Sequence, residues 1–261
     1  MSERGIDRRV VVRADPAAVA RRVAKRLIAR LAHESESHGG PIHLALTGGT
    51  VGTATLAEVA RRSPDSPIAW DRVHVWWSDE RFVAHDDPER NEGQARAALL
   101  SHVPIPAINI HAMAASDSGV SVEEAADAYA RELARFAASE GANPWPSFSV
   151  CLLGVGPDAH IASLFPDRPE ILVTDRAVVP VYDSPKPPPV RLSLTRPVIN
   201  ASRRIWLVMA GAEKASALGL ALAGASYTSV PAAGAKGRER TMFFVDEAAA
   251  AEVPAELIES A

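Results

Sequence analysis

The residues best suited to chemistry lie in the segment GVGPDAHIASLFPD, at positions 154–167. Histidine exchanges a proton readily near neutral pH, so His160 is a candidate general base for an attacking water molecule. Asp158, two residues earlier, can orient the imidazole or stabilise its charged form. The alternatives are a structural or solvated histidine, and an Asx turn or a helix cap for the aspartate.

Three cationic residues are candidates for binding an anion. Arg81 can bind a phosphate or a developing carboxylate through its planar guanidinium. Lys214 is expected in the first turn of a helix, where the helix dipole disfavours a cation unless an anion is bound nearby. Arg191 begins a predicted strand. Each has a simpler alternative. Arg81 can form an ion pair with Asp79 or Glu80. Arg191 can be a charge at the edge of a strand, and Lys214 can be an ordinary surface lysine.

A glycine turn forms a further candidate anion site. The turn Thr47-Gly48-Gly49-Thr50 follows a predicted strand and opens a predicted helix. Its backbone N–H groups and the Thr50 hydroxyl can bind phosphate, although the glycines alone are also explained by a tight turn. The dinucleotide pattern G-x-G-x-x-G and the P-loop pattern are absent, so neither NAD nor ATP is indicated.

Several other polar or aromatic residues have simpler explanations. Ser163 would share a helical face with His160 but lacks a G-x-S-x-G context, so we expect a packing or capping residue. Asn91 is explained as a helix cap. Trp76 and Trp77 are expected in the core.

Composition argues against several classes of protein. Cys151 is the only cysteine and the histidines show no metal-binding spacing, so no metal is expected. The net charge is −4, and Lys and Arg are scattered along the chain, which gives no indication of a nucleic-acid partner. The amino terminus has no apolar signal region and no apolar run is long enough for a membrane span, so a cytoplasmic protein is expected.

Strand and helix signals alternate along the chain. Asp15-Pro16 is typical of a cap and first helical residue, and a helix of about 18 residues is expected to follow. The 261 residues favour one α/β domain over 1–261, with a mostly parallel sheet covered by helices on both faces. Strands are expected at 42–46, 73–77, 108–113, 148–153, 191–194 and from 204 to Gly211, and helices at 51–62, from Asn91, at 121–140 and up to 222.

The loops after these strands should meet at one edge of the sheet. Parallel strands bring the loops at 47–50, 78–81, 154–160 and 211–214 to the same side, where ligands bind in open α/β sheets. The proline-rich segment 183–190 is expected to form a stiff loop on the rim of this site.

These segments, taken in order, resemble the 6-phosphogluconolactonase family. The resemblance rests on LALTGGT, VWWSDERFV, DDPERN, LLGVGPDAHIASLFP, RLSLT and GAEKASAL, and the block at 154–166 is its most specific part. It implies hydrolysis of 6-phosphoglucono-δ-lactone to 6-phosphogluconate in the oxidative pentose phosphate pathway, without metal or organic cofactor. It also implies a three-layer Rossmann-like fold, similar to glucosamine-6-phosphate deaminase and ribose-5-phosphate isomerase, with Arg191 in the substrate pocket.

The chain departs from the family pattern at two places. Ala159 stands where the family usually has glycine, which matters only if the loop requires a positive φ there. The glycine turn has threonines where serines are usual, and threonine keeps the hydroxyl.

Two other functions are compatible with such a fold. A deaminase needs a carboxylate shortly after the histidine, where this chain has Leu164-Phe165-Pro166. A sugar-phosphate sensor of the transcriptional regulators carries a helix-turn-helix module, for which the roughly 40 residues before the first core strand leave no room. The resemblance implies a small phosphorylated sugar lactone as the partner, and we expect no nucleic acid or membrane partner and a monomer or a weak homo-oligomer.

Overall fold

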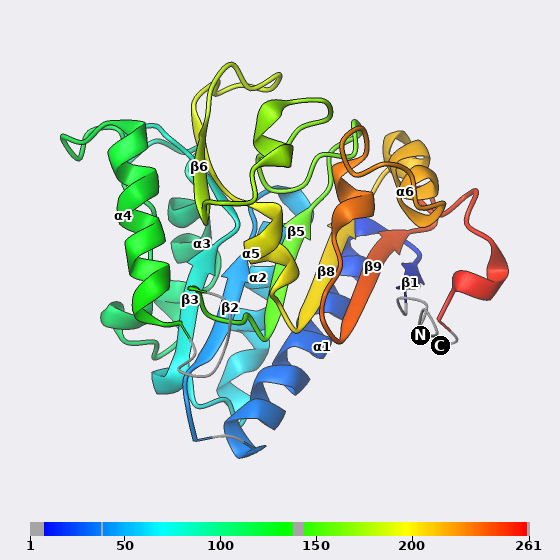
Figure 1. The fold of residues 1–261 in the computed structure, drawn as a ribbon. Helices are drawn as coiled ribbons and strands as arrows, with labels where there is room; N and C mark the ends of the chain where they lie inside the picture. The colour runs from blue at the N-terminus through cyan, green and yellow to red at the C-terminus, as the bar shows by residue number, and fades with distance from the viewer. Residues whose placement is uncertain (1–7, 38, 138–143, 260–261) are drawn as a thin grey trace, which may run out of the picture.

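The computed structural model describes residues 8–37, 39–137 and 144–259 (Figure 1). Its main sheet has six strands in the order β1-β9-β8-β5-β2-β3, and every neighbouring pair is parallel. The central strands are almost entirely apolar because helices cover both of their faces. The strands are β1 (Arg8–Arg13), β2 (Ile42–Leu46), β3 (Val73–Trp77), β5 (Val150–Gly154), β8 (Arg204–Met209) and β9 (Arg240–Asp246).

Helices on both faces of this sheet complete three layers. Figure 1 shows α1 (Pro16–Ser37) and α2 (Thr50–Arg62) behind the sheet and α5 (Arg196–Asn200) in front of it. α4 (Val122–Arg135) packs Tyr129 against Trp76 of β3. The predicted α/β fold with a mostly parallel sheet is confirmed. The shorter helices α3 and α6 span Asn91–Ala98 and Ala215–Leu222.

A second, smaller sheet was not predicted. It is antiparallel, in the order β4-β7-β6, and consists of β4 (Asp79–Arg81), β7 (Arg191–Leu194) and β6 (Val178–Val181). The prediction of a plain loop at 78–81 is therefore wrong: the chain breaks at Ser78 and continues as β4. This pairing places Arg81 directly opposite Arg191.

Other boundaries differ from the predicted ones. The first helix has 22 residues and begins as expected, with the Asp15 carboxylate accepting from Ala18 N–H at 2.7 Å. The predicted strand 108–113 is wrong, since a 3-10 turn ends at Asn109 and only Ile110 forms a bridge, to Val75 of the edge strand β3. Helix α4 ends at Arg135, and part of the predicted segment 121–140 lies outside the described residues.

The core lies between the layers. Trp76 and Trp77 are fully buried, as predicted, and so is the free Cys151 on β5. Within the described part of the chain, no helix combines the length and the apolar character needed to cross a bilayer.

Candidate active site

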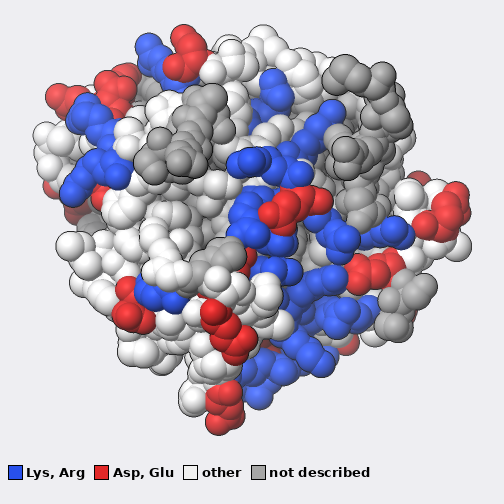
Figure 2. Space-filling view, turned by 60° about the horizontal axis from the view of Figure 1, so that its bottom comes forward, with Lys and Arg blue, Asp and Glu red and all other residues white. Residues whose placement is uncertain are grey.

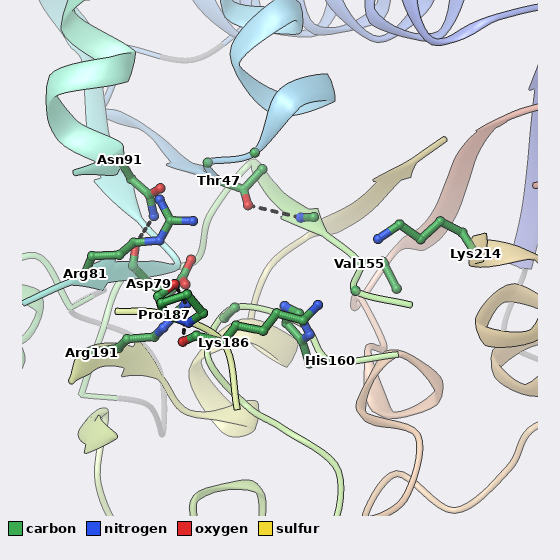
Figure 3. Close-up of a pocket in the computed structure, with 15 residues that line it drawn as sticks. Thr47, Asp79, Arg81, Asn91, Val155, His160, Lys186, Pro187, Arg191 and Lys214 are labelled. Carbon is green, nitrogen blue, oxygen red and sulfur yellow. Dashed lines mark hydrogen bonds between the residues drawn. The ribbon is translucent and has the colours of Figure 1, made fainter. Parts of the chain in front are cut away.

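A cleft of about 250 Å³ opens at the carboxyl ends of β2, β3 and β5, so the predicted convergence of loops at one edge is confirmed. Its lining combines the glycine turn after β2 with residues from β4, β7 and the loop after β5. Figure 3 shows Lys214 reaching toward the cleft from one side and Arg81 and Arg191 from the other, with His160 and Lys186 between them.

A tight turn places His160 beside Asp158. Ala159 N–H donates to Gly156 O at 2.9 Å, and Gly156 N–H donates to His160 O at 3.1 Å. Pro157 follows Gly156 at the position where proline favours a turn. The turn projects both side chains to the same side, and His160 Nδ1 lies 2.6 Å from Asp158 Oδ1.

The charge of Asp158 fixes which imidazole nitrogen carries the proton. Burial would raise the pKa of Asp158, but the hydrogen bond and charge of His160, together with Lys186, hold that pKa well below its ordinary value. Lys186 Nζ lies 3.6 Å from Asp158 Oδ1. An ionised carboxylate only accepts hydrogen bonds, so Nδ1 of His160 donates and Nε2 is left as the acceptor. Nε2 makes no hydrogen bond with the described residues.

The loop requires the positive φ that glycine usually supplies. Ala159 has φ +65° and is 3% exposed, and its carbonyl accepts from Ala232 N–H at 3.0 Å. Alanine tolerates this conformation only with strain, so the departure from the family pattern falls on a residue where conformation matters.

The glycine turn lines the cleft and caps α2. Gly49 has φ +83° and is the cap residue of α2. Gly48 lies against the Asn91 side chain, with which a Cβ would collide. The Thr47 hydroxyl accepts from Gly154 N–H at 3.0 Å, which ties β2 to β5. Thr50 differs from expectation, because it lines adjoining hollows and not the cleft that contains His160.

The two arginines face the cleft as a cross-strand pair. Like charges directly opposite each other destabilise a sheet, so an anion bound between Arg81 and Arg191 would stabilise this arrangement. Arg81 Nη1 donates to Glu89 O at 2.6 Å, while its buried Nε has no partner among the described residues. The alternative of an ion pair between Arg81 and Asp79 or Glu80 is not seen among the described residues.

Arg191 is largely occupied by the proline-rich loop, which does lie on the rim as predicted. Its Nη2 donates to Lys186 O at 3.0 Å and Pro187 O at 2.9 Å, and its Nε donates to Pro188 O at 3.1 Å. The side chain therefore holds the segment that presents Lys186 to the cleft.

Sequence reasoning assigned no binding role to Lys186, Asp79 or Asn91, all of which line the cleft. The cap predicted for Asn91 is wrong: its amide donates to Asp79 O at 2.9 Å, and its buried Oδ1 has no partner among the described residues. The Glu80 carboxylate caps α3 instead, accepting from Asn91 N–H at 2.7 Å and Glu92 N–H at 2.8 Å. No local sequence signal points to Glu80, because it lies eleven residues before Asn91 and reaches the helix only through the fold.

Ser163 is a packing residue, as expected, although the helix assumed around it is not present. The segment 157–164 forms turns and bridges. Ser163 is fully buried, and its hydroxyl donates to Asp79 Oδ2 at 2.7 Å. Its oxygen is therefore committed to a buried carboxylate and does not face a substrate.

Lys214 lies immediately before α6, at the end of a 3-10 turn, and not inside the first turn of that helix. Burial and the nearby Lys186 ammonium lower the pKa of Lys214 below its ordinary value. A bound anion would relieve this repulsion.

Among the described residues, no group of three or more His, Cys, Asp or Glu side chains is arranged to hold a metal ion.

The sequence profile of the family described as Glucosamine-6-phosphate isomerases/6-phosphogluconolactonase matches residues 14–244. The chain belongs to this family. Among its relatives, the 6-phosphogluconolactonase of Streptomyces coelicolor is 48% identical over 250 residues, which cover 95% of each chain. The 6-phosphogluconolactonase of Mycobacterium tuberculosis is 47% identical over 232 residues, covering 88% of this chain and 92% of its own.

Solved structures of the family share the fold. The 6-phosphogluconolactonase from Thermotoga maritima is 26% identical, with a TM-score of 0.78 over 92% of this chain and 99% of its own. A monomeric glucosamine-6-phosphate deaminase is 17% identical, with a TM-score of 0.75 over 93% of this chain and 99% of its own. The second similarity concerns the fold alone.

Proposed function

We propose that the chain hydrolyses 6-phospho-D-glucono-1,5-lactone to 6-phospho-D-gluconate, with water activated by His160. The observation that carries this proposal is the His160–Asp158 hydrogen bond at 2.6 Å in a cleft lined by four cationic side chains. The names of the bacterial relatives at 47–48% identity support the substrate.

The reaction needs one proton shuttle. A water oxygen attacks the lactone carbonyl carbon while its proton passes to Nε2 of His160. The tetrahedral intermediate then breaks the bond to the ring oxygen, which takes the proton back from the imidazolium. Asp158 stabilises the imidazolium between the two steps. One water is consumed, and the product acid ionises to a carboxylate.

Arg81 is the group best placed to stabilise the developing oxyanion. It reaches the cleft from the side opposite Lys214 (Figure 3), and its Nε has no protein partner among the described residues. A guanidinium donor aimed at a developing negative charge lowers the barrier more than it stabilises the neutral lactone. Arg191 contributes by holding the loop at 186–188.

The phosphate group of the substrate binds at the other side of the cleft. Gly48, Gly49 and Lys214 line both the cleft and the hollow that adjoins it. The amino terminus of α2 offers free N–H groups there, and the lysine supplies a full positive charge. The lactone ring then spans the distance from Lys214 to His160.

Geometry weighs against the deaminase alternative. After His160, the chain runs into Leu164 and Phe165, which are 0% and 1% exposed and pack in the interior. No carboxylate therefore follows the histidine at the position that ring opening requires.

The cellular location and the oligomeric state are part of the same proposal. We place the protein in the cytoplasm, as a monomer or a weak homo-oligomer. The cytoplasmic placement rests on Cys151, which as the single cysteine can form no intramolecular disulfide and so fits a reducing compartment. Light scattering of the purified protein measures its oligomeric state.

The test follows the loss of freshly generated lactone with and without protein, because the lactone also hydrolyses spontaneously. The wild type should exceed the spontaneous rate, and His160→Asn should lower kcat by about 10²–10⁴. His102→Asn is the matched control, since His102 is exposed and remote from the cleft. A wild type no faster than the blank would reject the function, and an active His160→Asn would reject the mechanism.

A further inference from the structure

The side chain of Asn91 presents a buried hydrogen-bond acceptor at the cleft. Asn91 is 2% exposed, and its Oδ1 has no partner among the described residues. Its Nδ2 donates to Asp79 O at 2.9 Å, and because a backbone carbonyl only accepts, this bond fixes which end of the amide is the nitrogen. Buried polar atoms are rarely left unpaired, so a donor bound in the cleft would explain the unpaired oxygen.

The fold leaves this acceptor without the structural task that it commonly has. An asparagine at the start of a helix often accepts from the first backbone N–H groups. In α3 the Glu80 carboxylate instead accepts from the N–H groups of Asn91 and Glu92, at 2.7 and 2.8 Å. The amide oxygen of Asn91 therefore remains available to a ligand.

The acceptor points toward the glycine turn of the cleft. A Cβ at position 48 would collide with Asn91 Oδ1, so the amide can occupy this place only because residue 48 is glycine. Gly48 and Asn91 both line the cleft. Any larger residue at position 48 would displace the acceptor.

Arg81 is the neighbour of Asn91 on this side of the cleft. Glu80 Oε1 accepts from both backbone N–H groups, from Arg81 at 2.8 Å and from Asn91 at 2.7 Å. One oxygen thus holds the two residues together, and Figure 3 shows both side chains on the side of the cleft opposite Lys214. Since Arg81 Nε is also buried without a partner among the described residues, neighbouring residues present one unpaired donor and one unpaired acceptor.

Positive charge by itself does not distinguish one sugar phosphate from another. Figure 2 turns the lower end of Figure 1 forward and shows Lys and Arg side chains collected in a band on that face. Arginines of α1, β8 and β9 also line a hollow outside the cleft. The cations of the cleft can bind any phosphate, so selection among sugars requires a group that pairs with one particular hydroxyl.

We propose that Asn91 is a specificity-determining residue whose Oδ1 accepts a hydrogen bond from the C2 hydroxyl of the lactone. The inference rests on the proposed function, in which Arg81 binds the carbonyl oxygen on C1. The C2 hydroxyl is on the carbon next to that carbonyl, so it is the hydroxyl that meets the neighbour of Arg81. An amide oxygen has no proton to donate, and it therefore favours a hydroxyl over a phosphate oxygen.

A comparison of two lactones tests this inference. They are 6-phosphogluconolactone and its 2-deoxy analogue, prepared by oxidation of 2-deoxyglucose 6-phosphate. Each kcat/KM is divided by the spontaneous hydrolysis rate of the same lactone, which corrects for their different reactivity. The wild type should prefer the hydroxylated lactone by about tenfold or more, because the analogue leaves a buried acceptor unpaired. Asn91→Leu removes the acceptor at similar size and should reduce this preference to about twofold or less.

Asn109→Leu is the matched control. Asn109 is 5% exposed and donates from Nδ2 to Asp71 O at 2.8 Å, as Asn91 does to Asp79, but it does not line the cleft. Its substitution should leave the preference for the hydroxylated lactone unchanged. Circular dichroism checks folding, and Gly48→Ala is the second variant: it keeps the amide but displaces its oxygen, so it should also reduce the preference.

Two results would overturn the inference while the proposed function stands. If Asn91→Leu slowed both lactones equally, the amide would serve only to tie β4 to α3. If the wild type accelerated both lactones equally, the substrate would not pair with the acceptor. A wild type no faster than the spontaneous reaction of the hydroxylated lactone would instead reject the proposed function, and this inference with it.

Discussion

One hydrogen bond between His160 and Asp158 fixes both the orientation of the imidazole and which of its nitrogens carries the proton. The carboxylate holds Nδ1 at 2.6 Å, and Lys186 lies near the same oxygen. The pair thus resembles an imidazole base with a carboxylate that supports its charged form. Arg81, Lys186 and Lys214 line the cleft around this pair. Arg191 lines it too, but its guanidinium donates mainly to backbone carbonyls.

Asp158→Asn should lower kcat by about 10–100-fold. The amide keeps the size of the side chain but cannot stabilise the imidazolium, so the acidic limb of the pH–rate profile should move to lower pH. Rates measured from pH 5 to 8, with Asp175→Asn as a control at an exposed site, check this. An unchanged pH profile would show that the aspartate has only a structural role.

Lys214→Ala should lower kcat/KM for the phosphorylated lactone by about 1.5–3 kcal/mol, the value of a hydrogen bond to a charged group. Unphosphorylated gluconolactone should be affected little, because it has no phosphate to lose. Lys25→Ala, at an exposed position of α1, is the control. Equal losses for both lactones would contradict the assignment of Lys214 to the phosphate.

Ser163→Ala should keep activity within about tenfold of the wild type, since the proposed mechanism assigns the serine no chemical step. The substitution should instead lower the free energy of unfolding. Asp79 loses the hydroxyl donor at 2.7 Å, and a buried acceptor left unpaired costs about 1–3 kcal/mol. Urea unfolding measures this change. An inactive variant, or an acyl adduct on Ser163 in the wild type, would indicate a nucleophilic mechanism.

At the scale of elements, the site depends on a turn and on the pairing of β4 with β7. The turn at 156–160 places the side chains of His160 and Asp158 side by side, and the antiparallel pairing sets Arg81 opposite Arg191. The backbone forms both arrangements. Substitutions that alter the backbone conformation of these segments should therefore lower activity more than substitutions that change only side-chain polarity.

Gly156→Ala should lower kcat/KM by about 10²-fold, because an added Cβ would collide with the side chains of His160 and Asp158. Gly93→Ala in α3 is the matched control: its Cβ meets no neighbour, and alanine should stabilise the helix by about 0.5–1 kcal/mol. Kinetics and thermal unfolding of both variants separate the two effects. Full activity of Gly156→Ala would show that the turn tolerates rearrangement.

At the scale of the whole molecule, we infer a single domain, because one contiguous cluster of buried apolar residues extends from Val10 to Ala249. His43 and His111 are buried in this core beside Trp76, and the partly exposed His74 contacts both. Trp76 Nε1 donates to His43 Nδ1 at 3.1 Å, and His74 Nδ1 lies 2.9 Å from His111 Nε2. Burial, together with the neighbouring histidines, lowers the pKa of His43 to about 3.

The buried histidines should make stability depend on pH. Burial lowers the pKa of His111 to about 4, against the opposing effect of Glu132. The unfolded chain, with histidine pKa values near 6.5, binds more protons between pH 6.5 and 4, so stability should fall as pH falls through this window, by about 3 kcal/mol for each histidine. Urea unfolding from pH 7 to 4.5 measures the slope.

His43→Gln isolates the effect of the buried histidines. Burial also raises the pKa of Glu80 to about 7. Between pH 4.5 and 7 this carboxyl therefore makes the free energy of unfolding rise as pH falls, opposite to the histidines. The wild type and the variant share this contribution, so it cancels in the comparison. The variant should be less sensitive to acid than the wild type, whereas His102→Gln at an exposed position should leave the slope unchanged. If the free energy of unfolding changed equally with pH in all three proteins, the buried histidines would be ruled out as the source of the pH dependence.

The sequence did not predict β9, an inner strand of the main sheet. By itself it determined the parallel strands β2, β3, β5 and β8, the helices α1 and α2, the loops at one sheet edge and the proximity of Asp158 to His160. All of these follow from local patterns: apolar runs, caps, turns and residues two apart. The tertiary structure alone decided that β4 pairs with β7 across about 110 residues, that Lys186 and Asn91 enter the cleft, and that arginines of α1, β8 and β9 line one hollow. Those contacts depend on strand register and long-range packing, which local periodicity does not specify.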